Sequence, residues 1–160
     1  MKKNIFKIIL LIAIDQMLKF IIINTVGVSG KAITVIPKLL SIIYVENSGA
    51  AFGMFLERFF LIALDIVIIV FLIRLSTSKK FNFSNNFKSG MSLIIAGGAG
   101  NLIDRIFRGH VIDYIDVSGM FNFPVFNFSD ICIVVGVMMS FVIILIETVK
   151  SQEKSLDIKE

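Results

Sequence analysis

Two aspartates carry the chemistry that this sequence indicates most directly. Asp113 and Asp130 lie 17 positions apart, and the loop between them contains Ser118 and Gly119, which can reverse the chain. Two carboxylates at close range cannot both ionise cheaply, so they share one proton. One carboxylate can then act as a base on water while the other protonates a carbonyl oxygen. The pair therefore predicts hydrolysis of an amide bond without a metal, a thiol or a serine.

The same acids also have a purely structural interpretation. Two acids near an interface can simply be solvated, and Asp130 is well placed as an N-cap or first-turn acid of a helix.

Other reactive side chains are few. Cys132 is typical of a core cysteine, and His110 of a surface turn. A single Cys and a single His exclude an internal disulfide and argue against a zinc site, so we expect no metal and no cofactor.

Further ionisable and polar residues interrupt apolar stretches, where each one is a functional hypothesis. Asp15 and Lys19 are four positions apart, so they share a helix face and can pair. Such a pair can also serve only to lock helix packing. Asn101 and Arg105 share a face in the same way, and Arg105 can alternatively extend to an interface. Asp65 lies in another apolar stretch, and the sequence indicates no partner for it.

The composition shows what kind of protein must position these residues. The chain has 160 residues, of which 56% are hydrophobic and 18% charged, whereas soluble domains are about 45–50% apolar and about 25% charged. A core of this size cannot hide such an excess, so a polytopic membrane protein is indicated. The net charge of +4 then fits basic loops that face anionic lipid better than it fits nucleic acid.

Four apolar runs have the length of about 20 residues that crosses a bilayer. We expect a single integral membrane domain of residues 1–160. Its third span is rich in glycine (Gly97, Gly98 and Gly100), which lets helices approach closely. The four predicted spans are residues 5–26, 59–75, 88–107 and 130–149.

The distribution of Lys and Arg gives the orientation, because basic residues gather on the cytoplasmic side. Most of them lie at the two ends and between the second and third spans, which predicts that both termini are cytoplasmic. The loops 27–58 and 108–129 then face outward. Residues 39–46 predict a short strand, and Pro124 confines 121–128 to a sheet edge or to irregular structure. The expected fold is an all-α membrane protein of four transmembrane helices with a small extracytoplasmic β or irregular platform.

Four ordered segments resemble motifs of the lipoprotein signal peptidases (signal peptidase II), a family of bacterial integral-membrane aspartyl peptidases. The resemblance covers nearly the whole chain. The segments are Asp15-Gln16 followed by Lys19, Glu46 to Gly53, Gly97 to Arg105 with Gly109 to Asp116, and Phe126 to Asp130.

The resemblance implies that Asp113 and Asp130 are the catalytic pair of an aspartic endopeptidase. Such an enzyme removes signal peptides from diacylglyceryl-modified prolipoproteins by cleaving before the lipidated cysteine. The segment from Asn47 to Phe55 would form a short interfacial helix or flap over the site. Residues expected to bind substrate or support the site are Asn47, Gly49, Asn101, Arg105, Asn127, Asp15 and Lys19.

The expected partners are lipid-modified prolipoproteins and membrane lipids, with no nucleic acid and a monomeric chain. The expected location is the bacterial cytoplasmic (inner) membrane, with the acid pair on its extracytoplasmic face. Two alternatives remain open: a small transporter or channel with an intramembrane carboxylate relay, and a non-catalytic assembly protein. Relays usually place their carboxylates near the midplane, where this chain has only Asp15 and Asp65.

Overall fold

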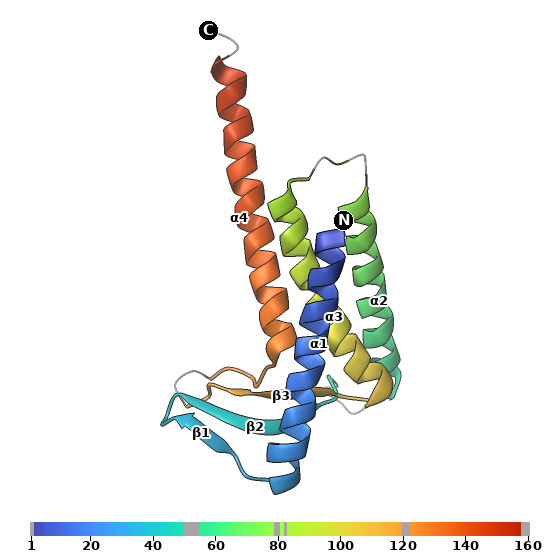
Figure 1. The fold of residues 1–160 in the computed structure, drawn as a ribbon, viewed down its shortest axis with the longest axis vertical. Coiled ribbons are helices and arrows are strands. Elements are labelled where there is room, and N and C mark those ends of the chain that lie inside the picture. The colour runs from blue at the N-terminus through green and yellow to red at the C-terminus, as the bar shows by residue number, and fades with distance from the viewer. Residues whose placement is uncertain (1, 50–54, 79–80, 82, 120–121, 158–160) are drawn as a thin grey trace.

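The computed structural model describes residues 2–49, 55–78, 81, 83–119 and 122–157. All four predicted spans fall on helices, so the helical fold class is confirmed. Both the start of α1 and the end of α4 lie on the side of the molecule away from the small sheet (Figure 1). The helices are α1 (Lys2–Ile22), which continues into the short π-helix η1 (Ile23–Gly27), α2 (Phe55–Thr77), α3 (Asn85–Phe107) and α4 (Phe128–Asp157).

Two of the helices are long and apolar enough to cross a membrane by length and composition. The qualifying segments are Arg58–Thr77 in α2 and Phe128–Gln152 in α4, each with a mean hydropathy of 2.6. None of the α2 segment and only 17% of the α4 segment is buried, so their apolar side chains face outward. Large exposed apolar surfaces mark contact with another apolar phase. That α1 and α3 also span the membrane stays a prediction.

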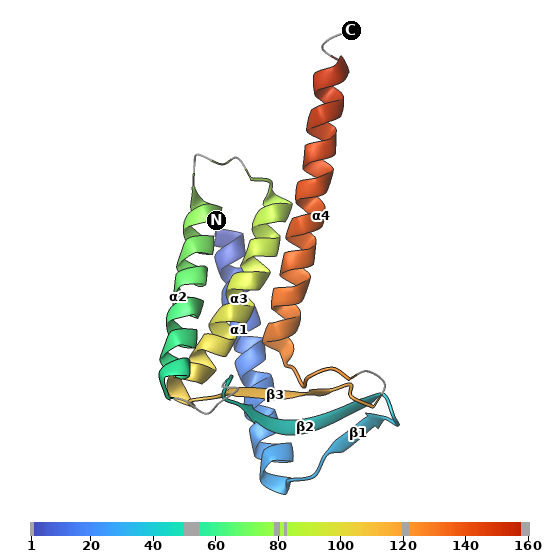
Figure 2. The ribbon, with the colours of Figure 1, turned by 180° about the vertical axis from the view of Figure 1, so that it is seen from behind.

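Helix α3 is the central element, because it packs against each of the other three helices. Seen from behind, it runs between α2 and α4 (Figure 2). Its glycines make this possible. A Cβ atom on Gly97 would lie 2.3 Å from the backbone oxygen of Ser129, and one on Gly100 would lie 2.7 Å from Asp15 Oδ2. The predicted close approach of helices at this glycine-rich stretch is therefore confirmed.

A three-stranded antiparallel sheet lies at the end where α4 begins (Figure 1). The strand predicted at 39–46 is confirmed, while the other two strands were not predicted. Residues 122–127 are irregular, as Pro124 requires, and touch the sheet through an isolated bridge between Phe126 and Ile115. The strand order is β1 (Ile33–Ile36), β2 (Leu40–Asn47) and β3 (Val111–Asp116).

The register of the sheet determines which side chains meet at its centre. Val45 lies opposite Asp113, and Asn47 lies opposite Val111. Residues two apart on a strand share a face, so Asn47 and Asp113 are diagonal neighbours on one face of the sheet. The sheet thus brings the loop between α1 and α2 to the segment that follows α3. The interfacial helix or flap predicted for 47–55 falls largely on residues 50–54, outside the described residues.

The glycine contacts predict opposite outcomes for two adjacent substitutions. Gly97→Ala places a methyl group against the Ser129 carbonyl and should destabilise the protein by about 1–3 kcal/mol, the usual effect of overpacking. Gly98→Ala is the matched control, since its Cβ would lie 3.5 Å from Ile69 Cγ1, an ordinary contact. Thermal unfolding in detergent should show a lower midpoint for the first variant and an equal or higher one for the second. Equal midpoints would contradict this packing.

Candidate active site

The structure brings Asp113 and Asp130 together around one asparagine. Asn127 Nδ2 donates to Asp113 Oδ1 at 2.6 Å, and Asn127 N donates to Asp130 Oδ2 at 3.0 Å. Asp113 belongs to β3 and Asp130 to the first turn of α4, so the chain reversal after β3 is what lets one residue reach both acids. At that reversal Ser118 N donates to Asp116 Oδ1 at 2.8 Å, which confirms the turn predicted there.

Asp130 is also part of the N-terminal cap of α4. Asn127 precedes the helix, and its Oδ1 accepts a hydrogen bond from Asp130 N at 3.0 Å, while its own N–H bonds back to the Asp130 carboxylate. This reciprocal pattern is a capping box with an acid at the third helical position. The structural interpretation of Asp130 as a first-turn acid is therefore correct, and the same Asn127 that caps the helix also bonds to Asp113. The cap engages Oδ2 of Asp130 and leaves its Oδ1 to accept from Asn101 Nδ2.

Asp113 is almost wholly buried, with 2% of its surface exposed. Its Oδ2 accepts a hydrogen bond from Asn47 Nδ2 at 2.7 Å, and its Oδ1 accepts the bond from Asn127 Nδ2 described above. Burial raises the pKa of Asp113 above its usual value, and the negative charge of Asp130 raises it further. Hydrogen bonds from the two asparagines and the charge of Lys19 act in the opposite direction without cancelling the rise. Asp113 therefore keeps its proton to higher pH than a solvated aspartate does.

Asn101 connects Asp130 to a cation deeper in the helices. Its Nδ2 donates to Asp130 Oδ1 at 2.8 Å, and its Oδ1 accepts from Lys19 Nζ at 3.0 Å. Asn127 Nδ2 also reaches Asn101 Oδ1, at 3.2 Å. An ammonium group can only donate hydrogen bonds, so the atom of the Asn101 amide that faces Lys19 must be the oxygen. The amide nitrogen of Asn101 must then face the carboxylate of Asp130.

Lys19 is completely buried, with 0% of its side chain exposed. Its Nζ lies 2.9 Å from Asp15 Oδ2 and 2.8 Å from Asp104 Oδ2, besides its bond to Asn101. The three donors of the ammonium group therefore meet three acceptors. The predicted pairing of Asp15 with Lys19 is confirmed, but the structure shows a larger network than a local pair.

Asp104 is the residue that sequence reasoning missed. It is also 0% exposed, and it accepts from Arg108 and from Ile112 N, the latter at 3.1 Å, in addition to Lys19. Two acids and two bases are thus neutralised together, which buried charges require. Asp104 and Arg108 are four positions apart, as Asp15 and Lys19 are. This spacing is the feature of the sequence that could have indicated the pairing of Asp104.

The same network holds α4 in place. Asp15 Oδ1 accepts a hydrogen bond from Ser129 N at 3.1 Å, so α1 binds the start of α4 directly. Gln16 joins the network from the next position, because its Nε2 donates to the Gly100 carbonyl at 3.2 Å and to Asp104 Oδ1 at 3.2 Å. Helices α1, α3 and α4 therefore meet at one set of buried polar contacts immediately beneath the two acids.

Arg105 points elsewhere. Its Nη1 lies 2.8 Å from Asp65 Oδ2 on α2, and the two side chains are 19% and 22% exposed. This supplies the partner for Asp65 that the sequence did not indicate. Although Asn101 and Arg105 are four positions apart, Asn101 bonds to Asp130 while Arg105 bonds to α2. Arg58 Nη2 donates to the carbonyl oxygen of Arg105 at 2.8 Å and adds a second link between α2 and α3.

Gly49 shapes the end of β2 beside Asp113. Its N–H donates to Asn47 Oδ1 at 2.8 Å, which turns the amide nitrogen of Asn47 toward Asp113. The φ angle of Gly49 is +69°, in the left-handed region that favours glycine. A Cβ atom there would lie 2.7 Å from Leu61 Cδ1. The glycine thus permits the tight turn that orients Asn47.

The remaining reactive side chains lie outside this group. Cys132 is buried, as predicted for a core cysteine. His110 Nδ1 lies 3.7 Å from Glu46 Oε2. Among the described residues, no group of three or more His, Cys, Asp or Glu side chains is arranged to hold a metal ion.

Comparisons with known proteins agree with the resemblance seen in the motifs. Residues 7–146 match the family described as signal peptidase (SPase) II. The lipoprotein signal peptidase of Fusobacterium nucleatum subsp. nucleatum is 37% identical over 142 residues, which are 84% of this chain and 81% of that protein. The lipoprotein signal peptidase of Staphylococcus aureus strain JH9 is 32% identical over 151 residues, 92% of this chain and 91% of that protein.

A solved structure of a bacterial membrane enzyme is also similar to this chain. It superposes with a TM-score of 0.80 at 30% sequence identity, and the match covers 91% of this chain and 94% of the other. A second such structure gives a TM-score of 0.78, also at 30% identity, over 92% and 90% of the two chains.

The buried network predicts that Lys19 is essential for folding. Lys19→Met leaves the Asp15 and Asp104 carboxylates without their cation, and breaking a buried ion pair costs about 3–5 kcal/mol. Lys31→Met is the matched control, because Lys31 is exposed and a surface change of this kind stays within about 0.5 kcal/mol. Denaturation of both purified variants should separate them. A Lys19→Met protein as stable as its control would show that the network does not carry the fold.

Proposed function

Because the chain belongs to the signal peptidase II family, we propose that Asp113 and Asp130 are the catalytic pair with which it cleaves signal peptides from prolipoproteins. This makes the chain an aspartic endopeptidase. The observation that carries the proposal is the hydrogen bonding of both acids to Asn127, with Asp113 buried and its pKa raised. Two acids with one proton between them are the minimum that acid–base cleavage of an amide requires.

The two acids have different surroundings, which assigns their roles. Asp130 is half-buried whereas Asp113 is almost wholly buried, so the Asp130 carboxylate is the better placed of the two to meet a water molecule. Asp130 is the proposed base. Asp113, whose raised pKa favours the protonated form, is the proposed acid.

The reaction then follows in two proton-balanced steps. Asp130 removes a proton from water as the water oxygen bonds to the scissile carbonyl carbon, while Asp113 gives its proton to the carbonyl oxygen. In the tetrahedral intermediate, Asp130 returns a proton to the leaving nitrogen as the carbon–nitrogen bond breaks. The hydroxyl proton of the intermediate goes back to Asp113, so the pair ends with the single proton that it began with.

The neighbouring residues have supporting roles in this proposal. Asn47, Asn101 and Asn127 orient the acids through the hydrogen bonds described above, and Asp15 with Lys19 holds Asn101 from below. Arg105 is the proposed contact for the substrate backbone. Asp65 restrains its guanidinium, and its buried Nε has no hydrogen-bond partner among the described residues. Gly49 maintains the turn beside the entering peptide.

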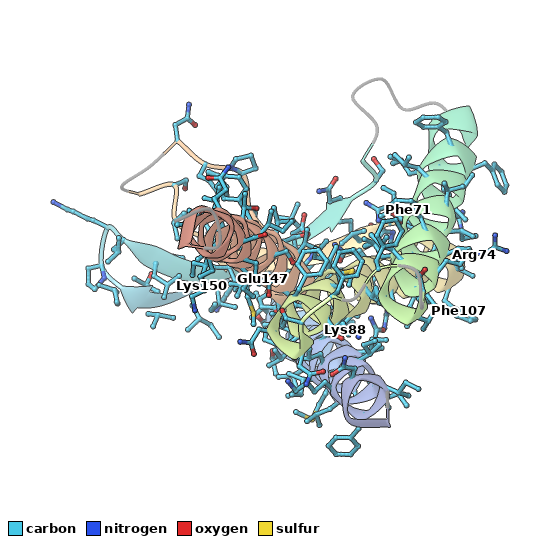
Figure 3. The ribbon with its side chains drawn as sticks, turned by 90° about the horizontal axis from the view of Figure 1, so that it is seen from above. Phe71, Arg74, Lys88, Phe107, Glu147 and Lys150 are labelled. Atoms are coloured by element: carbon cyan, nitrogen blue, oxygen red, sulfur yellow. The ribbon has the colours of Figure 1, made fainter. Side chains whose placement is uncertain are left out.

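The proposed setting is the bacterial cytoplasmic (inner) membrane, with four spans and both termini in the cytoplasm. The acid pair and the sheet lie at one end of the helices, and the basic residues Arg74, Lys88 and Lys150 lie at the other, onto which Figure 3 looks. Basic residues mark the cytoplasmic side, so the acids face outward. One chain supplies every residue of the proposed site, which is consistent with a monomer. The lipid of the diacylglyceryl-modified substrate then stays in the bilayer beside the exposed apolar helices.

The alternative of a proton-relay transporter has less support. A relay needs carboxylates that gain and lose protons within the span. Asp15 is instead paired with Lys19 and Asp65 with Arg105. The deep acids are therefore held as counter-ions.

The proposed roles predict that Asp113→Asn and Asp130→Asn each lower cleavage of a lipidated precursor by at least about 10²–10⁴-fold. Asparagine keeps the shape of the side chain but cannot exchange the proton. Asp116→Asn is the matched control, because Asp116 lies on the same strand, is not buried and should leave turnover unchanged. Wild-type turnover by folded Asp113→Asn or Asp130→Asn protein would refute the assignment of these two acids as the catalytic pair.

The hydrogen bond from Asn47 predicts a shift in the pH profile. This bond stabilises the Asp113 carboxylate and lowers its pKa, so Asn47→Ala should raise that pKa further. The acid then keeps its proton to higher pH, and the alkaline fall in kcat should move upward. Tyr44→Phe, a neutral change on the same strand, should leave the profile in place. An unmoved or downward-shifted alkaline limb for Asn47→Ala would show that Asp113 is not the acid.

A further inference from the structure

A large cavity lies at the end of the helices away from the two acids. Its volume is about 940 Å³, near the upper end of the range of about 300–1,000 Å³ for ligand pockets, and it is lined by α1, α2 and α3. Helices α1 and α2 each pack against α3 but hardly touch each other, which leaves the space between them open. Neither the acid pair nor the buried network around Lys19 contributes a lining residue. The proposed reaction therefore leaves this cavity unexplained.

The lining combines an apolar wall with a polar rim. Isoleucines from all three helices form the wall, which suits a hydrocarbon chain, and hydroxyl, amide and ammonium groups gather toward the helix ends. The wall includes Ile8, Ile9, Ile73 and Ile95, and the rim includes Lys7, Ser76, Thr77, Asn85, Lys88 and Ser89.

The rim is positively charged. Lys7 and Lys88 both line the cavity, and no described lining residue is acidic. Lys7 Nζ donates to Ser89 Oγ at 3.3 Å, whereas the ammonium group of half-buried Lys88 makes no hydrogen bond or ion pair with a described residue. Helices α1 and α3 both begin here, so the positive ends of two helix dipoles add to the field. The cavity has the chemistry to bind an anion.

We propose that this cavity binds a phospholipid with an anionic headgroup from the cytoplasmic leaflet. The phosphate lies between Lys7 and Lys88, and the upper part of an acyl chain lies along the isoleucines. The proposal rests on the membrane orientation given above but not on the catalytic roles of the two acids. Anionic lipids supply the negative surface potential of that leaflet, to which basic segments are attracted.

The charge of the rim also distinguishes this occupant from the signal peptide of a substrate. The segment that precedes the apolar part of a signal peptide is positively charged. Two lysines that have no acidic partner among the described lining residues repel such a segment and attract a phosphate. The apolar wall and cationic rim together match one lipid molecule.

Retention of phosphatidylglycerol by the purified protein tests the proposal. Native mass spectrometry in neutral detergent, after addition of phosphatidylglycerol or phosphatidylcholine, should show one phosphatidylglycerol kept by the wild type and no comparable retention of phosphatidylcholine. The double variant Lys7→Gln with Lys88→Gln should bind phosphatidylglycerol about 25-fold more weakly, because each lysine near an anionic surface contributes about fivefold. The matched control is Arg74→Gln with Lys150→Gln, which removes two charges from the same end but outside the cavity and should retain the lipid (Figure 3).

Other outcomes would overturn the proposal. Equal losses in the two double variants would show only a general attraction of charge at this end, and equal retention of the two lipids would show that the headgroup is not recognised. A raised KM for prolipoprotein in lipid-free detergent, seen only with the Lys7 and Lys88 variant, would assign the cavity to substrate. Thermal unfolding in detergent alone checks that each variant is folded. Ile73→Trp, which fills the wall without altering charge, should also displace the lipid, and unchanged retention there would contradict insertion of an acyl chain.

Discussion

The buried ammonium group of Lys19 holds the helices and the candidate site together. Lys19 has no access to water, so its charge must be balanced inside the protein. Asp15 from the same helix and Asp104 from α3 supply the counter-charges, and Asn101 supplies the third acceptor. Because Asp15 also binds the start of α4 through Ser129 N, neutralising one lysine ties three helices together. The glycines of α3 let the helices come close enough for these short contacts.

The orientation of the two acids follows from this arrangement. Lys19 determines which way the amide of Asn101 faces, and that amide in turn presents a donor to Asp130. Asn127 caps α4 and bridges Asp130 to Asp113, and Asn47 completes the environment of Asp113 from the sheet. The two acids are thus oriented by neutral amide groups, of which Asn101 is itself fixed by the buried lysine. No further charged side chain is needed beside the acids.

Much of this could be predicted from the sequence, and the limits have a physical cause. The helices follow from long apolar runs, and the pairing of Asp15 with Lys19 follows from their spacing within one helix. The contact between Asp65 and Arg105 joins residues 40 positions apart on different helices, so no local period indicates it. Asp104 was missed as a central member for the same reason, since its bond to Lys19 crosses from α3 to α1. Strands β1 and β3 are short, and each depends on pairing with β2 rather than on its own pattern.

We propose that the two acids hold one proton, with Asp113 as its principal site. Infrared difference spectroscopy measures this directly, because a protonated carboxyl group has its own carbonyl stretching band. At the pH of maximal activity, the spectrum of the wild type minus that of Asp113→Asn should contain this band, and the band should persist in Asp116→Asn. A difference spectrum that shows only an ionised carboxylate lost with Asp113 would show that Asp113 does not hold the proton.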